Sequence, residues 1–252
     1  MSDWARRLDE ARLALMLLTR LPAGRIDDPV PAMKYAAWAY PLAGLAVGGI
    51  GGAALWLGQA LGLPALASSF IALAAMALAT GAMHEDGLAD TADGFGGGAT
   101  RERKLEIMRD SRIGSYGVLA LVLVIGLRAS ALAALMPGLA GALVVIAGAM
   151  ASRAVLPIVM AHLPPARTDG LGRSAGSPEM PVWAGALAIG LLALLVFLPF
   201  SAWVPALLAG GAAALAVSRM ALRQIGGQTG DTLGATQLLT ETAILLAAVA
   251  AS

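Results

Sequence analysis

The sequence predicts an all-α membrane protein, a polytopic helical bundle with about seven transmembrane helices and an N-terminal amphipathic helix. Of its 252 residues, 58% are hydrophobic and only 13% are charged, whereas soluble domains carry about 25% charged residues. The apolar residues form runs long enough to cross a bilayer, and the charged residues gather between those runs. This composition excludes a soluble enzyme, a nucleic-acid-binding domain and a disordered chain. Because the chain has no cysteine, it also excludes a disulfide scaffold and a thiolate metal site.

The N-terminal segment, residues 1–34, mixes basic and acidic residues with a short apolar pattern. Leu8, Leu15 and Leu18 recur at helical spacing, which predicts an amphipathic helix over residues 4–20. Its apolar part is too short for a membrane span or the core of a secretory signal. We expect this helix to lie on the cytoplasmic membrane surface; the alternative is a helix packed as in a soluble protein.

Seven apolar runs follow the N-terminal segment, and each is a candidate membrane span. The sixth run is short, and the last contains Gln237, Thr240 and Glu241. We expect one integral-membrane domain over residues 1–252. The predicted spans are 36–58, 65–83, 114–136, 139–161, 182–200, 202–218 and 232–251.

The positive charges predict the orientation of the chain. Of the 17 Lys and Arg residues, only Arg128 and Arg153 fall inside the predicted spans. Positively charged loops stay in the cytoplasm, so we expect the four charged segments there and, with seven spans, the C-terminus outside. These segments are residues 1–35, 84–113, 162–181 and 219–231.

The first span carries small residues at four-residue spacing, Gly44, Gly48 and Gly52. This pattern lets two membrane helices approach closely. We interpret it as a helix-packing face.

An acidic cluster follows the second span, in the segment HEDGLADTADGFGGG at residues 84–98. Asp86, Asp90 and Asp93 stand at i, i+4 and i+7, so they share one face if the helix continues. Carboxylates at this spacing suit Mg²⁺, with Mn²⁺ as a substitute, because proteins hold these ions by carboxylates and substrate phosphates. Glu85 lies about 100° away from Asp86 and is a weaker candidate ligand. The alternative is a solvated acidic face.

Glycines and basic residues follow the acids. The glycines at positions 94 and 96–98 suit either the approach of an anion to the backbone or a flexible loop. Arg109 and Arg112 lie next to the following span, so we expect them to bind a diphosphate beside the metal. Arg101, Arg103 and Lys104 fit that role and the ordinary basic character of a cytoplasmic loop equally well.

Three charged residues fall within the spans, Arg128, Arg153 and Glu241. Such residues usually face the interior of a bundle and pair. One interpretation is a structural ion pair of Glu241 with either arginine. The other is that they line a substrate cavity.

Two later cytoplasmic segments also contain candidate site residues. LPPARTDGLGRSAG at 163–176 carries Arg167 and Asp169, and GGQTGDTLGATQ at 226–237 brings Asp231 to the start of the last span. Asp231 fits either the N-cap of that helix or a further carboxylate of the site.

Together with LLTRLP at 17–22 and LEIMRDSRIGSYG at 105–117, these motifs resemble the cobalamin synthase family, adenosylcobinamide-GDP ribazoletransferase. The resemblance implies a multi-pass enzyme of the cell inner membrane whose active site faces the cytoplasm. It implies a Mg²⁺-dependent transfer that joins adenosylcobinamide-GDP to α-ribazole, or α-ribazole 5′-phosphate, and releases GMP. Its partners would be these substrates, the lipid bilayer and other nucleotide-loop assembly enzymes.

The family pattern matches this sequence residue by residue. The matching positions are His84, Asp86, Gly87, Asp90, Asp93, Gly94, Arg109, Asp110, Arg112, Gly114, Asp169, Gly170 and Asp231. We predict that His84, Asp86, Asp90 and Asp93 are catalytic and that Glu85 joins the three aspartates as a metal ligand. The residues predicted to bind substrate are Arg109, Asp110, Arg112, Arg153, Arg167, Asp169 and Asp231.

The expected chemistry is an in-line phosphoryl transfer. His84 is a candidate to take the proton of the attacking hydroxyl; alternatively it orients a carboxylate, and an aspartate is the base. A CDP-alcohol phosphotransferase is a rival, but the Ala-Arg pair of its motif is Ala89-Asp90 here. A small-solute transporter is the other, and it predicts acids near the middle of the bilayer.

Overall fold

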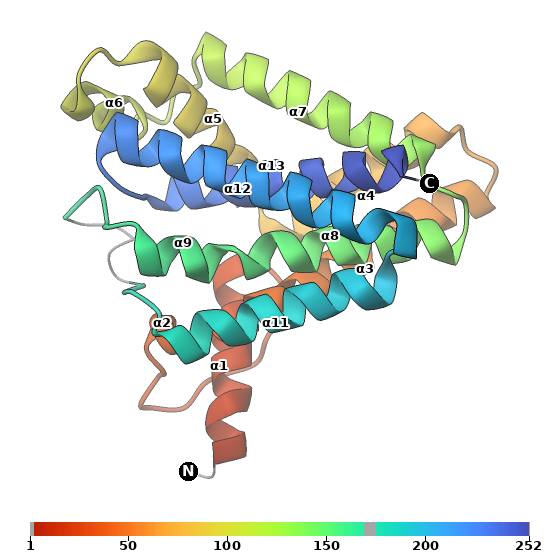
Figure 1. Cartoon of the computed structure of the whole chain (residues 1–252), viewed down its shortest axis with the longest axis horizontal. Helices are drawn as coiled ribbons and strands as arrows, with labels where there is room; N and C mark the ends of the chain where they lie inside the picture. The colour runs from red at the N-terminus through yellow and green to blue at the C-terminus, as the bar shows by residue number, and fades with distance from the viewer. Residues whose placement is uncertain (1–2, 169–174, 252) are drawn as a thin grey trace.

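The computed structural model describes residues 3–168 and 175–251 of the chain. Within these ranges the structure is helical (Figure 1), with one isolated β-bridge between Pro165 and Gln228. The helices are α1 Asp3–Leu18, α2 Met33–Ala36, α3 Tyr40–Ala60, α4 Ala65–Thr80, α5 Met83–Gly97, α6 Arg101–Ile107, α7 Ser115–Ala134, α8 Leu139–Ala154, α9 Leu156–His162, α11 Met180–Phe197, α12 Trp203–Ile225 and α13 Gly230–Ala250. Two short 3₁₀ helices are η1 Ala37–Ala39 and η2 Phe200–Ala202.

The helices confirm a polytopic helical membrane protein. Six helical stretches of the described chain are long and apolar enough to cross a bilayer, and the bent pair α4 and α5 would make a seventh. The span predicted at 202–218 is too short. The helix runs on to Ile225 and includes Arg219 and Arg223, because helical residues continue until Gly226 adopts a left-handed conformation, φ 75°.

The second span ends earlier than predicted, and α5 is not its straight continuation. Gly81 has φ 67° and Ala82 has φ 57°, and the chain bends by 91° between α4 and α5. The backbone N–H of Arg20 donates to the carbonyl of Ala79 at 2.7 Å. A side chain at position 81 would strike the Arg20 side chain. The bend is therefore set by glycine conformation and by contact with the N-terminal segment.

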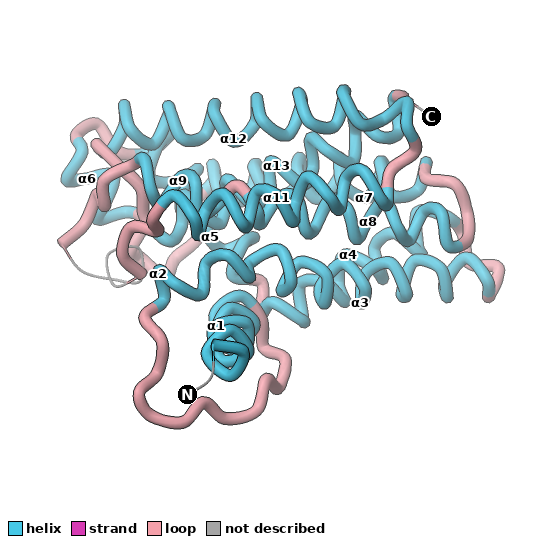
Figure 2. Tube along the Cα trace, turned by 60° about the horizontal axis from the view of Figure 1, so that its bottom comes forward, coloured by secondary structure: helices cyan, strands magenta, loops and turns pink. Residues whose placement is uncertain are grey.

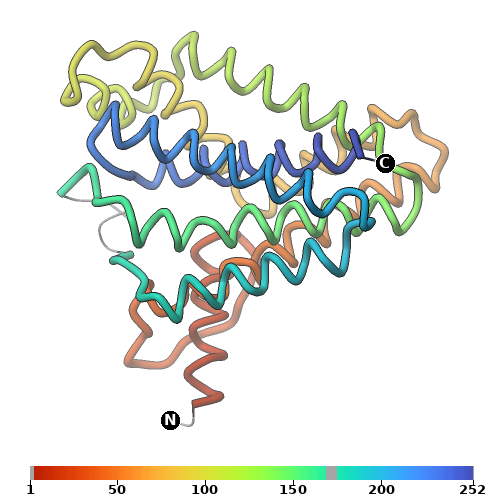
Figure 3. The backbone as a smooth tube through the Cα atoms, in the orientation of Figure 1, coloured from red at the N-terminus to blue at the C-terminus, as the bar shows by residue number. Residues whose placement is uncertain are grey.

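The two ends of the bundle differ in charge. Helix α6 and the C-terminal ends of α9 and α12 gather at one end (Figure 3), whereas the α3–α4, α7–α8 and α11–α12 connections and the C-terminus lie at the other. The connections at this second end carry no charged residue. The predicted grouping of charged segments on one side agrees with this arrangement.

Helix α1 crosses the bundle instead of joining it, and Figure 2 shows it almost end-on beside the other helices. Its buried face, which includes Leu13, Ala14 and Leu18, packs against Tyr40 and Leu156. The N-terminal helix is confirmed, although it ends at Leu18 and not at residue 20.

The tightest packing joins α3 to α8. Added side-chain carbons at Gly44, Gly48 and Gly52 would overlap the backbone of α8, at Ala149, Ile146 and Ala142 respectively. The glycine stripe is therefore a packing face, as predicted, and it sets the spacing of the two central helices.

Candidate active site

Helix α5 carries the acidic motif at the charged end of the bundle. Asp86 is exposed and Asp90 is half-buried, and the two residues stand one helical turn apart. The structure therefore keeps two of the three predicted carboxylates on an accessible face.

Asp93 has a different environment. Its two oxygens accept hydrogen bonds from the backbone N–H groups of Gly114, at 2.7 Å, and Gly117, at 2.9 Å, and the residue is only 7% exposed. A side chain at either glycine would collide with this carboxylate. Asp93 thus connects α5 to the start of α7 through hydrogen bonds. The spacing of the aspartates in the sequence did not predict this contact.

Asp231 joins Asp86 and Asp90 from the first turn of α13. Its Oδ2 lies 3.3 Å from Nη1 of Arg167 and accepts a hydrogen bond from the Thr229 hydroxyl at 3.3 Å. A side chain at Gly87 would approach the Asp231 carbonyl oxygen to 2.8 Å, so this glycine permits the two helices to cross closely.

The N-cap of α13 is Thr229, which exchanges side-chain and backbone hydrogen bonds with Thr232. The N-cap interpretation of Asp231 is therefore wrong. Its carboxylate belongs to the acidic cluster of Asp86, Asp90 and Asp231.

Burial, followed by the negative charges of Asp86, Asp231 and Asp93, raises the pKa of Asp90 to about 7, while Arg167 acts in the opposite direction. A cation would relieve this repulsion. Within the described ranges no three His, Asp or Glu side chains converge as a complete metal site. Carboxylate oxygens such as those of Asp86 and Asp90 fit Mg²⁺, which proteins usually hold through one or two carboxylates together with substrate phosphates.

The predicted arginines divide between two environments. Arg167 lies beside the acidic cluster, 3.3 Å from Asp231, and the positive charge of Arg109 also acts on Asp231, more weakly than that of Arg167. Arg112 instead forms a two-pronged contact with Asp110, at 2.7 and 3.0 Å, and its side chain is 88% exposed. These hydrogen bonds from Arg112 lower the pKa of Asp110 to about 2. Arg112 and Asp110 therefore satisfy each other at the surface.

Arg101 has a structural contact that sequence reasoning missed. Its guanidinium donates to the carbonyl oxygens of Ile225, at 2.7 Å, and Ala166, at 2.8 Å. It thereby joins α6 to the end of α12 and to the segment that carries Arg167. Backbone carbonyls as partners leave no signal in the sequence.

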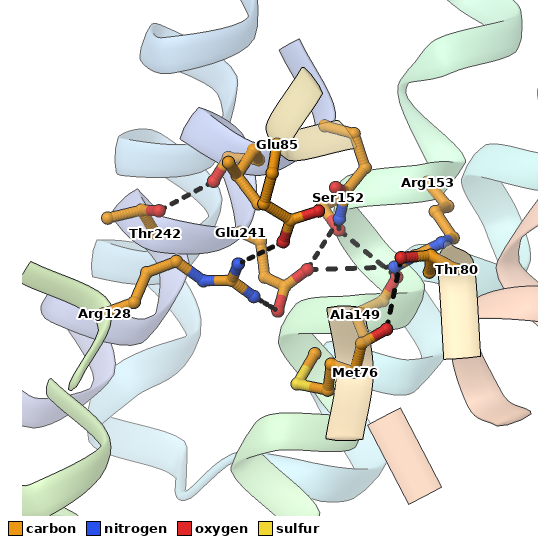
Figure 4. Close-up of polar contacts among 11 residues, drawn as sticks. Met76, Thr80, Glu85, Arg128, Ala149, Ser152, Arg153, Glu241 and Thr242 are labelled. Atoms are coloured by element: carbon orange, nitrogen blue, oxygen red, sulfur yellow. Dashed lines mark hydrogen bonds and ion pairs between the residues drawn. The ribbon is translucent and has the colours of Figure 1, made fainter. Parts of the chain in front are cut away.

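The charges inside the spans form a buried network (Figure 4). Arg128 contacts Glu241 at 2.6 Å and Glu85 at 3.4 Å, and Arg153 lies 3.8 Å from Glu241. Gln237 donates to Glu241 at 2.6 Å. Arg153 is 1% exposed, so the structure supports the ion-pair interpretation over a substrate cavity. Glu85 points into this network and away from the face of Asp86.

His84 lies on the buried side of α5. It is 2% exposed, and its Nε2 has no hydrogen-bond partner. The glycines at 94, 96 and 97 belong to α5, and Gly98 ends it, so they form no loop at the site. Asp169 and Gly170 lie outside the described residues.

The chain is similar to a group of named proteins. The model of the cobalamin-5-phosphate synthase family matches residues 10–249. A protein of Bradyrhizobium diazoefficiens named adenosylcobinamide-GDP ribazoletransferase is 49% identical over 242 residues, which cover 96% of this chain and 93% of that protein. Relatives with the same name are 47% identical over 254 residues in Azorhizobium caulinodans, with 96% of each chain covered, and 48% identical over 260 residues in Rhizobium meliloti, with 97% of each covered. No solved structure is significantly similar to the chain.

Proposed function

Because the chain belongs to the cobalamin-5-phosphate synthase family, we propose that it joins adenosylcobinamide-GDP to α-ribazole or α-ribazole 5′-phosphate. The product is adenosylcobalamin or its 5′-phosphate, and GMP leaves. This is the nucleotide-loop assembly step of cobalamin biosynthesis. The names of the relatives argue against both rivals, the CDP-alcohol phosphotransferase and the transporter.

The observation that carries this proposal is the cluster of Asp86, Asp90 and Asp231 at the charged end of the bundle, with Arg167 in contact with Asp231 and the charge of Arg109 acting on it. Arginines of this kind bind the phosphate oxygens of a diphosphate. The acidic residues would hold Mg²⁺, with Mn²⁺ as a substitute, which would supply charge stabilisation for the phosphate groups. The arginines thus match the negative charge of a diphosphate, and the carboxylates match the positive charge of a divalent cation.

The transfer forms one bond and breaks one. The 3′-hydroxyl oxygen of the ribazole, which is free whether or not the 5′ position carries a phosphate, attacks the phosphorus attached to the corrinoid, and the bond from that phosphorus to the oxygen of GMP breaks. The hydroxyl proton passes to a base. A carboxylate of the acidic cluster fits this role better than His84, because His84 is buried on the other side of α5.

We further propose that the chain lies in the cell inner membrane with its charged end in the cytoplasm. Thirteen of the arginines and both lysines lie outside the spans expected from the sequence, which is the distribution that retains loops in the cytoplasm. Both substrates would then be available on the same side as the acidic cluster.

The test is an assay of membranes that contain the chain, supplied with adenosylcobinamide-GDP and α-ribazole. We expect release of GMP, its loss with EDTA and its recovery with Mg²⁺. Asp86→Asn should lower turnover at least 100-fold because it removes a charged oxygen ligand and keeps the side-chain volume. Glu106→Gln is the matched control, because Glu106 pairs with Arg103 on exposed α6. Absence of GMP under every metal condition would refute the function.

A further inference from the structure

An apolar cavity of about 90 Å³ lies beside the first turns of α5 and α13. Its lining comes from four further places: the end of α1, the region of α2 and α3, α9, and residue 175. The mechanism above uses none of this cavity. Its lining includes Leu17, Met33, Tyr40, Met83, His84 and Met160.

The LLTRLP segment forms one wall of the cavity. Leu17 and Leu18 line it directly, and Arg20, two residues further on, is fixed against the α4–α5 bend by its hydrogen bond to Ala79. The N-terminal segment is therefore held against the start of α5. This gives a role to the one quoted motif that contributes no residue to the acidic cluster or to the arginines that act on it.

The cavity adjoins the acidic cluster along two helices. Gly230 lines the cavity, and the next residue is Asp231. Met83 also lines it, and Asp86 follows three residues later on α5, which is nearly one helical turn of about 5.4 Å. Along the axis of α5 these three residues rise by about 4.5 Å, so the cavity and the carboxylates are neighbours on this helix.

We propose that this cavity binds the base of the nucleoside acceptor, an assignment that rests on the proposed function. The base of α-ribazole is a benzimidazole, a flat fused ring with two methyl groups, and its ribose carries the attacking hydroxyl. With the base in the cavity, the ribose would lie between the cavity and the carboxylates of Asp86 and Asp231. The apolar base and the charged diphosphate then bind in adjoining compartments.

Two features of the wall fit such a base. Nε2 of His84 is buried without a hydrogen-bond partner, which is costly for a polar atom, and the benzimidazole ring has one unsubstituted nitrogen. Three methionines, Met33, Met83 and Met160, line the cavity. These flexible side chains can change rotamer and so widen the cavity of about 90 Å³ around a fused ring.

The first experiment narrows the cavity from α1. Leu17→Trp fills space at a partly buried position, and Met16→Trp is the matched control, because Met16 is the neighbouring residue, 47% exposed and outside the cavity. We expect Leu17→Trp to raise the KM for α-ribazole at least tenfold, with kcat and the KM for adenosylcobinamide-GDP within twofold of wild type. Equal KM values for α-ribazole in the two variants would overturn the proposal.

A second experiment measures binding without turnover, so that failure of the cavity and failure of the function are distinguishable. Equilibrium dialysis of α-ribazole against the purified chain in bilayer discs should show weaker binding to Leu17→Trp and unchanged binding to Met16→Trp. The riboside of unsubstituted benzimidazole is smaller because it lacks the two methyl groups. Leu17→Trp should therefore weaken its binding less than it weakens the binding of α-ribazole. If wild type releases no GMP but binds α-ribazole in this pattern, only the function fails. If wild type releases GMP and both variants bind equally, only the cavity assignment fails.

Discussion

At the residue scale, the carboxylate of Asp93 is held by the N–H groups of Gly114 and Gly117, whereas that of Asp86 lies on an exposed helix face. Hydrogen bonds to a charged group contribute about 1.5–3 kcal/mol each to stability. An Asn side chain has one oxygen and one NH₂ group, so it can accept a hydrogen bond from only one of the two glycine N–H groups. We therefore expect Asp93→Asn to lower the free energy of unfolding by about 2 kcal/mol and to lower activity as well.

Thermal unfolding in detergent measures this difference, with Asp86→Asn as the control. Asp86→Asn should leave the melting temperature unchanged or higher, because it removes one of several like charges. Equal melting temperatures for the two variants would show that the Asp93 contacts are not stabilising.

Arg101 and Arg103 provide a second residue-scale prediction. Arg101→Ala removes two hydrogen bonds from a charged guanidinium to backbone carbonyls and should lower stability by about 3 kcal/mol, at the lower bound of about 1.5 kcal/mol for each. Arg103→Ala removes an exposed ion pair with Glu106, which contributes less than about 1 kcal/mol. Chemical unfolding followed by tryptophan fluorescence measures both variants. A greater loss for Arg103→Ala would contradict the contacts of Arg101.

The predictability of the site residues follows from what each side chain contacts. Asp86 and Asp90 could be placed on one accessible face from their four-residue spacing. The special position of Asp93 depends on two glycine amides that follow it by 21 and 24 residues. The partners of Glu241 lie 113 residues away at Arg128 and four residues away at Gln237. The sequence predicted that either Arg128 or Arg153 pairs with Glu241, and in the packed structure both arginines contact it.

At the element scale, the α3–α8 contact depends on one face of α3. Gly44→Ala would drive a methyl group into the backbone of Ala149, and overpacking of this kind costs about 1–3 kcal/mol. Gly49→Ala is the matched control on the same helix, because nothing lies within 4 Å of the added carbon. It should be neutral or stabilising by up to about 1 kcal/mol. Melting temperatures in detergent decide the comparison, and a more harmful Gly49→Ala would contradict the packing face.

Element boundaries were less predictable than the elements themselves. Apolar residues continue through Gly81 and Ala82, so composition extended the second span across the bend. A left-handed conformation at these two residues, φ 67° and φ 57°, ends α4. Conversely, α12 extends past its apolar part because Arg219 and Arg223 are good helix formers.

At the scale of the whole molecule, the separation of charged and uncharged connections predicts the topology. Reporter fusions after residues 98 and 226 should report the cytoplasm, and a fusion after residue 252 should report the outside. The physical reason is that positively charged segments resist translocation. An external signal after residue 98 would place the acidic cluster on the wrong side for GDP-activated substrate and would overturn the orientation.

The buried network also constrains how the chain is made. Arg128 enters the membrane 113 residues before Glu241, a delay of about 6 to 23 s at a synthesis rate of about 5–20 residues per second. Of the two carboxylates that contact Arg128, Glu85 is the one already synthesised during that interval, and the carboxylate nearest to Arg153 is the later one, Glu241. The network is therefore complete only once Glu241 has entered the membrane. A chain that stops before Glu241 leaves Arg128 and Arg153 without the carboxylate that they share, so charge within the bilayer stays unneutralised until the last helix arrives.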